Sequence, residues 1–157
     1  ALAKNEHIQL ISYYTKPLYY NWSRDLPLIL TKKLIEKYKD DYTIYYIKHS
    51  SQPQSYEGAI PAEFNLRGII SLLLQADKRI LIDSFAQHMA AALELPSTVC
   101  WVTTNPDVLG YEIHENIKAN PYELHTDMNC YSGYNLQEPL DNIPYTKTEN
   151  IFNIKDL

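Results

Sequence analysis

One strand–helix–strand pattern in the middle of the chain constrains the fold more than any other feature. A short apolar run, residues 79–82, leads directly into Asp83 and Ser84, two residue types that favour helix N-caps, and then into an alanine-rich helical pattern. We expect this helix to stop near Leu95, because Pro96 cannot continue it. A second apolar run follows. The pattern predicts two parallel strands joined by a helix that starts at the carboxyl end of the first strand.

Strand and helix patterns alternate along most of the chain. Strands are expected at residues 7–12, 42–47, 62–66, 79–82, 97–102 and 113–118, and helices at 26–39, 69–76 and 84–95. Asp25 is the expected N-cap of the first helix, with Pro27 in its first turn, and residues 151–157 are expected to form a last helical turn. The alternation predicts an α/β fold, a Rossmann-like parallel sheet with helices on both faces.

Composition narrows the possible partners and the cellular compartment. The formal net charge of −5 and the absence of a basic run argue against a nucleic-acid surface. No apolar stretch is long enough for a membrane span, and the first residues lack the apolar core of a signal peptide, so a cytoplasmic protein is expected. Cys100 and Cys130 are expected to be free thiols in a reducing cytosol, with a disulfide between them as the open alternative.

Four short blocks of the sequence carry a family resemblance. The most specific block has Asp83-Ser84, then His88, a run of alanines and Pro96. The other three blocks are Thr104-Asn105-Pro106 with Gly110-Tyr111, Asn65-Leu66-Arg67-Gly68, and Arg24-Asp25-Leu26-Pro27. Together the blocks resemble the signature segments of the ADP-heptose:lipopolysaccharide heptosyltransferase-like proteins, glycosyltransferase family 9. They occur in the order of that family and span most of the chain.

The resemblance implies one half of a larger architecture. Proteins of this family have two Rossmann-like domains of the GT-B fold, with the active site between them. The blocks resemble the C-terminal domain, which holds the nucleotide-sugar donor; the N-terminal domain holds the acceptor and supplies the presumed general base. On this basis residues 1–119 are expected to form a nucleotide-sugar-binding domain, and residues 120–157 an extension that packs on it. The chain is then a fragment, an excised domain or a single-domain relative, and alone it is expected to transfer little.

The resemblance also implies partners. The substrate would be a nucleoside-diphosphate sugar, an ADP-sugar by analogy, and the acceptor a glycan or lipid of the kind used in lipopolysaccharide biosynthesis. An N-terminal acceptor domain of the same protein would be a further partner, and a peripheral position at the inner membrane is open. No cofactor is implied. His125, Asp127 and Cys130 are too scattered for a convincing metal site, so no metal is expected.

The chemistry of sugar transfer points to the start of the helix after Asp83. A departing diphosphate needs hydrogen-bond donors and positive charge, and a helix N-terminus supplies free N–H groups and a partial positive charge. The backbone at Ser84 and Phe85 is placed for this role, and the Ser84 hydroxyl adds a donor. The alternative role of Ser84 is that of an N-cap alone. The family usually has glycine at the position of Phe85, and a large side chain there hinders the close approach of a pyrophosphate.

The remaining candidates follow from the resemblance, each with an ordinary structural alternative. Asp83 would contact sugar hydroxyls, and His88, one turn after Ser84 on the same helix face, would reach a phosphate or the sugar. Arg24 stands where the family has a lysine, and Thr104 follows a strand end at the same crevice. The candidate donor-binding residues are Arg24, Leu66, Gly68, Asp83, Ser84, Phe85, His88 and Thr104.

Two other functions stay open. Phe85 and the missing family lysine favour a degenerate, non-catalytic scaffold or interaction module of the same fold. The third possibility is an unrelated α/β nucleotide-binding protein. Whether the chain is an enzyme is therefore left open at this stage, and no catalytic residue is assigned, since the base is expected in another domain.

Overall fold

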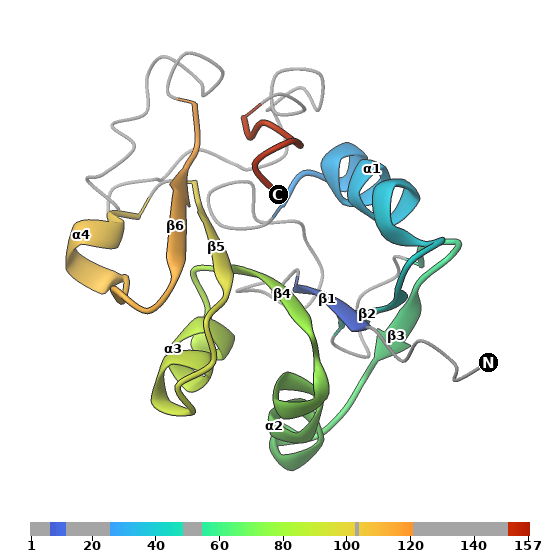
Figure 1. The fold of residues 1–157 in the computed structure, drawn as a ribbon, viewed down its shortest axis with the longest axis horizontal. Coiled ribbons are helices and arrows are strands. Elements are labelled where there is room, and N and C mark those ends of the chain that lie inside the picture. The colour runs from blue at the N-terminus through green and yellow to red at the C-terminus, as the bar shows by residue number, and fades with distance from the viewer. Residues whose placement is uncertain (1–6, 12–25, 49–54, 103, 121–150) are drawn as a thin grey trace, which may run out of the picture.

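The structure, a computed structural model, describes residues 7–11, 26–48, 55–102, 104–120 and 151–157. Strands and helices alternate along these residues, as the sequence pattern predicts (Figure 1). The elements are β1 (His7–Ile11), α1 (Leu28–Tyr38), β2 (Thr43–Ile47), β3 (Ile60–Ala62), α2 (Leu66–Gln75), β4 (Lys78–Ile82), α3 (Phe85–Ala92), β5 (Thr98–Trp101), α4 (Pro106–Leu109) and β6 (Glu115–Lys118).

The described strands form one parallel sheet with the order β3-β2-β1-β4-β5-β6. All the pairings are parallel; Leu10 of β1, for example, lies opposite Tyr46 of β2 on one side and Ile80 of β4 on the other. This order is typical of doubly wound Rossmann folds, in which the direction of the winding reverses between the first and fourth strands. The expected fold class is therefore confirmed.

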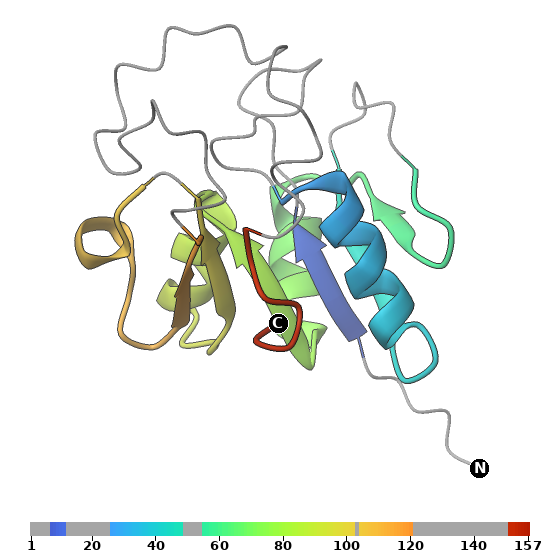
Figure 2. The same cartoon turned by 90° about the horizontal axis from the view of Figure 1, so that it is seen from above.

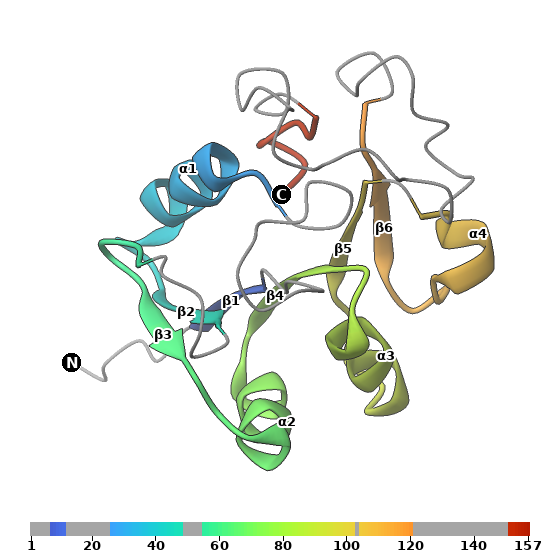
Figure 3. The ribbon, with the colours of Figure 1, turned by 180° about the vertical axis from the view of Figure 1, so that it is seen from behind.

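Helices cover both faces of this sheet. Figures 1 and 3 show α1 and the terminal segment on one face, and α2 and α3 on the other. The terminal segment, residues 151–157, is fastened to α1: Lys37 Nζ donates to Ile154 O at 2.9 Å, and Tyr38 Oη donates to Leu157 O at 2.6 Å. The helical turn predicted for this segment is wrong, because the segment consists of bends and turns.

The hydrophobic core lies between these layers. Ile80, Leu81 and Ile82 of β4 are fully buried, because a central parallel strand is covered on both faces. From α1, Leu30 and Leu34 are buried against the sheet at helical spacing. Each of these side chains contributes about 1.5–3 kcal/mol through burial. Among the described helices, none is long and apolar enough to cross a membrane.

The helix after β4 begins as predicted but ends earlier. Ser84 is its N-cap, with Oγ accepting from Ala86 N at 3.4 Å. The end near Leu95 predicted from Pro96 is wrong, because α3 stops at Ala92. Glu94 has a φ of 56°, Leu95 N donates to Ala90 O at 2.9 Å, and Glu94 N donates to Ala91 O at 3.0 Å. These two bonds form a Schellman motif, which closes the helix before the proline is reached.

The strand predicted before the second helix is also corrected. The strand predicted at 62–66 lies at 60–62, because Asn65 instead caps α2, its Oδ1 accepting from Gly68 N at 3.0 Å. After β5, Asn105 caps a short helix, α4, with its Oδ1 accepting from Asp107 N at 3.0 Å and Pro106 in the first turn.

At the first helix, Pro27 stands at the N-cap position. The N-cap predicted there, Asp25, lies outside the described residues.

Candidate functional site

The carboxyl edge of the sheet is where a ligand site is expected. Figure 2 shows the sheet from the side, with β1 pointing toward this edge. In open α/β sheets, ligands bind outside the carboxyl ends of the strands, at the point where the winding reverses. Here that point lies between β1 and β4, which are neighbours in the sheet.

Asp83 and Ser84 leave β4 at this point. Both residues are buried, with 3% and 6% of their surface exposed. Ser84 is extended, with a φ of −152°, and the chain enters α3 directly after it. The positive end of the α3 dipole is therefore directed at the carboxyl edge, where it favours an anion.

Phe85 occupies the first position of α3. Its side chain is partly buried and packs against the hydrophobic core. The residue therefore has two consequences: its ring contributes to packing, and its Cβ stands where a glycine would leave the backbone open to a phosphate.

A second group of candidates follows β3, at the start of α2. Leu66 is 57% exposed, and Gly68 donates its N–H to the Asn65 cap. A Cβ on Gly68 would lie 2.6 Å from the Cβ of Phe64, so this glycine permits the position of Phe64. A small hollow of about 190 Å³ is lined by Tyr45, Phe64, Gly68, Ser71, Leu72 and Gln75.

Phe64 was missed by the sequence reasoning. It lies two residues after the end of β3, precedes the Asn65 cap, and is 52% exposed. An aromatic side chain left exposed at the carboxyl edge offers a flat apolar surface to a ligand. The sequence pattern placed it in the middle of the strand expected at 62–66, so no signal marked its position before the N-cap of α2.

Thr104 and Arg24 are two further predicted residues. Thr104 follows β5, and its Oγ1 is buried with no hydrogen-bond partner in the part of the chain that the structure describes. A buried hydroxyl without a partner is uncommon, so this group keeps an unused hydrogen-bond donor beside the strand end. Arg24 lies outside the described residues.

His88 is exposed on α3 and contacts the connection between α4 and β6. Its Nδ1 lies 2.9 Å from Tyr111 Oη. The neighbouring Gln87 is fully buried; its Nε2 donates to Leu109 O at 3.2 Å, and its backbone oxygen accepts from Nε2 of the buried His114 at 2.9 Å. These bonds hold α3 to the segment between α4 and β6. Tyr111 was not among the site residues predicted from the sequence.

The sheet order sets the distances between these groups. Asp83, Ser84 and Thr104 follow β4 and β5, which are paired, so the structure brings them to one part of the edge. Leu66 and Gly68 follow β3, which lies three strand spacings from β4. At a spacing of about 4.8 Å, that separation is about 14 Å. A single ligand could contact both groups only if it were long and lay along the edge.

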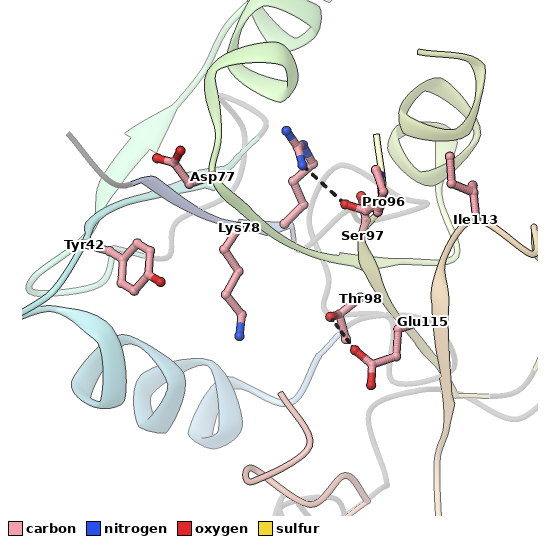
Figure 4. A pocket seen from close by; sticks show the side chains of 9 residues that line it. Tyr42, Asp77, Lys78, Pro96, Ser97, Thr98, Ile113 and Glu115 are labelled. Atoms are coloured by element: carbon pink, nitrogen blue, oxygen red, sulfur yellow. Dashed lines mark hydrogen bonds between the residues drawn. The ribbon is translucent and has the colours of Figure 1, made fainter. Parts of the chain in front are cut away.

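A larger groove lies at the opposite, amino edge of the sheet (Figure 4). It has a volume of about 440 Å³, and Lys78, Thr98 and Glu115, which begin β4, β5 and β6, are among its lining residues. Several of its polar groups are hydrogen-bonded within the fold: Thr98 Oγ1 donates to Glu115 Oε2 at 3.3 Å, and Lys78 Nζ donates to Tyr38 Oη at 2.8 Å.

Arg79 also lines this groove, and its guanidinium is hydrogen-bonded to backbone carbonyls of the fold. It donates to Leu73 O at 2.8 Å, to Ala76 O at 2.5 Å and to Pro96 O at 3.3 Å. Desolvation by burial lowers the pKa of Arg79. We therefore take the carboxyl edge, and not this larger groove, as the candidate site. Within the described ranges, no group of three or more His, Cys, Asp or Glu side chains is placed to hold a metal ion.

Several solved structures have a fold similar to that of this chain. No family model matches the chain, and no curated protein matches it significantly. Among solved structures, E. coli heptosyltransferase WaaC with ADP is similar, with a TM-score of 0.62 and 16% identity over 76% of this chain and 40% of that chain. E. coli ADP-heptose LPS heptosyltransferase II has a TM-score of 0.58 and 15% identity over 73% of this chain and 39% of that chain.

A third similar structure covers nearly the whole chain. The glycosyl transferase family 9 protein from Veillonella parvula DSM 2008 has a TM-score of 0.57 and 12% identity over 96% of this chain and 46% of that chain. The likenesses confirm the resemblance to heptosyltransferase-like proteins of family 9 at the level of the fold. The chain thus has a glycosyltransferase-like scaffold, and it spans less than half the length of these proteins.

Proposed function

We propose that this chain is the nucleotide-sugar-binding part of a glycosyltransferase, which transfers a sugar from a nucleoside-diphosphate donor to a glycan or lipid-linked acceptor. One observation carries the proposal: the N-terminus of α3 opens at the winding reversal, directly after the buried Asp83 and Ser84. That arrangement suits a diphosphate, because helix N–H groups and the helix dipole both favour an anion.

The diphosphate end of the donor would lie over α3. The backbone N–H of Phe85 and the Ser84 hydroxyl would donate to phosphate oxygens, and the buried Thr104 Oγ1 is a further donor on the neighbouring strand end. Asp83 would accept hydrogen bonds from sugar hydroxyls. Arg24, if it reaches this edge, would add positive charge to the phosphates.

The base of the nucleotide would lie at the other end of the site. Phe64 and Leu66 expose apolar surface at the carboxyl edge beside β3, about 14 Å from the end of β4. An extended nucleoside diphosphate has the length to lie along this edge, with its base on Phe64 and its phosphates at Ser84. Gly68 serves this arrangement indirectly, since it allows Phe64 its position.

The acceptor side of the reaction is proposed to come from elsewhere. In the transfer, an acceptor oxygen bonds to the anomeric carbon of the sugar, the bond from that carbon to the phosphate oxygen breaks, and a base takes the acceptor proton. The chain spans only 40% of WaaC, so we place the base and the acceptor site in a second domain. The protein would act in the cytoplasm, at the inner membrane if its acceptor is a lipid.

The alternative, a degenerate scaffold that binds no donor, is favoured by Phe85. A phenylalanine at the first position of α3 narrows the approach of a phosphate to the helix N-terminus. The two functions differ in one measurable property, which is the affinity for nucleotides.

Calorimetry with ADP, UDP and GDP tests the proposal. ADP comes first, because the similar WaaC structures are described with ADP and with ADP-2-deoxy-2-fluoro heptose. We expect one nucleotide to bind preferentially. We also expect Asp83→Ala to weaken the binding of the nucleotide sugar that carries this nucleotide. Asp41→Ala, at an exposed turn far along the chain from the site, is the matched control and should bind as the wild type does. Absence of binding at millimolar nucleotide would favour the degenerate scaffold.

A further inference from the structure

The ring of His88 is held by groups outside its own helix. Tyr111 Oη lies 2.9 Å from Nδ1, and the two rings meet edge to face with centroids 5.6 Å apart. Gln87 Nε2 lies 3.2 Å from Nδ1 and 3.1 Å from Nε2. Because this amide nitrogen is nearly equidistant from both ring nitrogens, it lies over the ring and not on either in-plane lone pair. The hydrogen bond in the plane of the ring at Nδ1 is therefore the one with Tyr111 Oη.

Tyr111 is in turn fixed from the core of the molecule. Asn116 Nδ2 donates to the backbone oxygen of Tyr111 at 2.9 Å, and Asn116 Oδ1 accepts from Trp101 Nε1 at 2.8 Å. Trp101 is 1% exposed. On its other side, the Tyr111 ring packs edge to face on His114, with centroids 6.0 Å apart. A connected set of contacts thus runs from the buried strand β5 to the ring of His88.

We propose that Tyr111 is a positioning residue for His88 in the binding of the donor diphosphate. A neutral imidazole carries one proton, and the hydrogen bond at one nitrogen decides which nitrogen carries it. In this proposal the Tyr111 hydroxyl donates to Nδ1, and the proton of the neutral ring is then on Nε2. The Nε2–H of His88 is then a donor of fixed direction, one helical turn after Ser84, for the terminal phosphate of a nucleoside diphosphate. This inference rests on the proposed function of the site.

Nucleotide binding by four forms of the protein tests the inference. ADP and AMP are titrated into the wild type, Tyr111→Phe, His88→Ala and the double variant. Tyr111→Phe keeps the ring and removes only the hydroxyl, so we expect it to weaken ADP binding about 3- to 10-fold. AMP lacks the terminal phosphate, and its affinity should not change. In the His88→Ala background, Tyr111→Phe should have no further effect, because the two residues act through one contact.

Tyr42→Phe is the matched control, since Tyr42 lies at the amino-edge groove; both affinities should stay at the wild-type values. Thermal unfolding of each variant verifies that it is folded. The inference is overturned if Tyr111→Phe binds ADP as the wild type does, if AMP is weakened equally, or if the loss persists without His88. A wild type that binds neither nucleotide removes the proposed function together with the inference. ADP binding that is indifferent to Tyr111→Phe removes the inference alone.

Discussion

Single residues determine where helices end in this fold, and Glu94 is the clearest case. It takes the left-handed position at the end of α3, where helices usually have glycine. A non-glycine residue there costs about 1–2 kcal/mol in backbone energy. The helix ends at this residue because Leu95 N and Glu94 N both find carbonyl partners in its last turn.

Glu94→Gly should therefore stabilise the protein. Relief of the left-handed strain outweighs the extra freedom of glycine in the unfolded chain, so we expect a gain of about 0.5–1 kcal/mol in the free energy of unfolding. Urea denaturation followed by circular dichroism measures it. Glu94→Ala keeps the strain and is the control. An equal gain for both variants would contradict the explanation.

The thiol of Cys100 gives a chemical test of how well β5 is buried. It is fully buried in β5, and burial, followed by the charge of Glu115, raises the pKa of its thiol. Because the thiolate is the reactive form, we expect no reaction with a disulfide reagent at pH 8 in a folded Cys130→Ser variant. The same variant should release one equivalent of product in denaturant. Rapid modification of the folded variant would show that the strand is accessible.

At the scale of elements, Arg79 joins three parts of the chain. Its guanidinium, at the start of β4, donates to carbonyls of Leu73, at the end of α2, and of Ala76, just after it, and to Pro96, which follows α3. The last carbonyls of a helix lack partners within the helix, and the negative end of its dipole favours a cation. Arg79 thus holds α2 to the sheet.

Replacing Arg79 by methionine should destabilise the fold. The variant keeps much of the side-chain length but leaves three carbonyls without their charged donor, and we expect a loss of about 2–4 kcal/mol in the free energy of unfolding. Arg67→Met, on the exposed side of α2, is the matched control and should change it by less than about 0.5 kcal/mol. Similar losses in both variants would mean that the three bonds contribute little.

The elements also show which parts of the structure the sequence could predict. The strands at β1, β2 and β4 and the Ser84 cap were predicted correctly, because apolar runs and cap residues act locally. The end of α3 was not, since a Schellman motif at Glu94 depends on backbone hydrogen bonds and has no glycine to mark it.

The site shows the same division between local and long-range features. Sequence spacing placed Asp83, Ser84 and Thr104 at strand ends, and the paired strands β4 and β5 bring them together. The roles assigned to these residues stay predictions. Phe64 and Tyr111 could not be found in the same way. The exposure of Phe64 depends on the packing of α2, and Tyr111 meets His88 across 23 positions of sequence.

At the scale of the whole molecule, the sheet order sets the length of the proposed site. The order β3-β2-β1-β4 separates Phe64 from Ser84 by three strand spacings, about 14 Å, along one edge. In the proposed site, an exposed aromatic ring and a helix N-terminus are the two ends of one extended surface. In the larger groove at the opposite edge, Lys78 and Glu115 are hydrogen-bonded within the fold.

Amide chemical-shift mapping of the isotope-labelled protein during titration with ADP tests this claim most directly. We predict that the largest shifts occur at the start of α3, residues 84–88, with a second group at residues 64–68 beside Phe64. The amino-edge residues Lys78, Thr98 and Glu115 should stay unchanged. Shifts confined to the amino edge, or no shifts at millimolar ADP, would contradict a nucleotide site at the carboxyl edge.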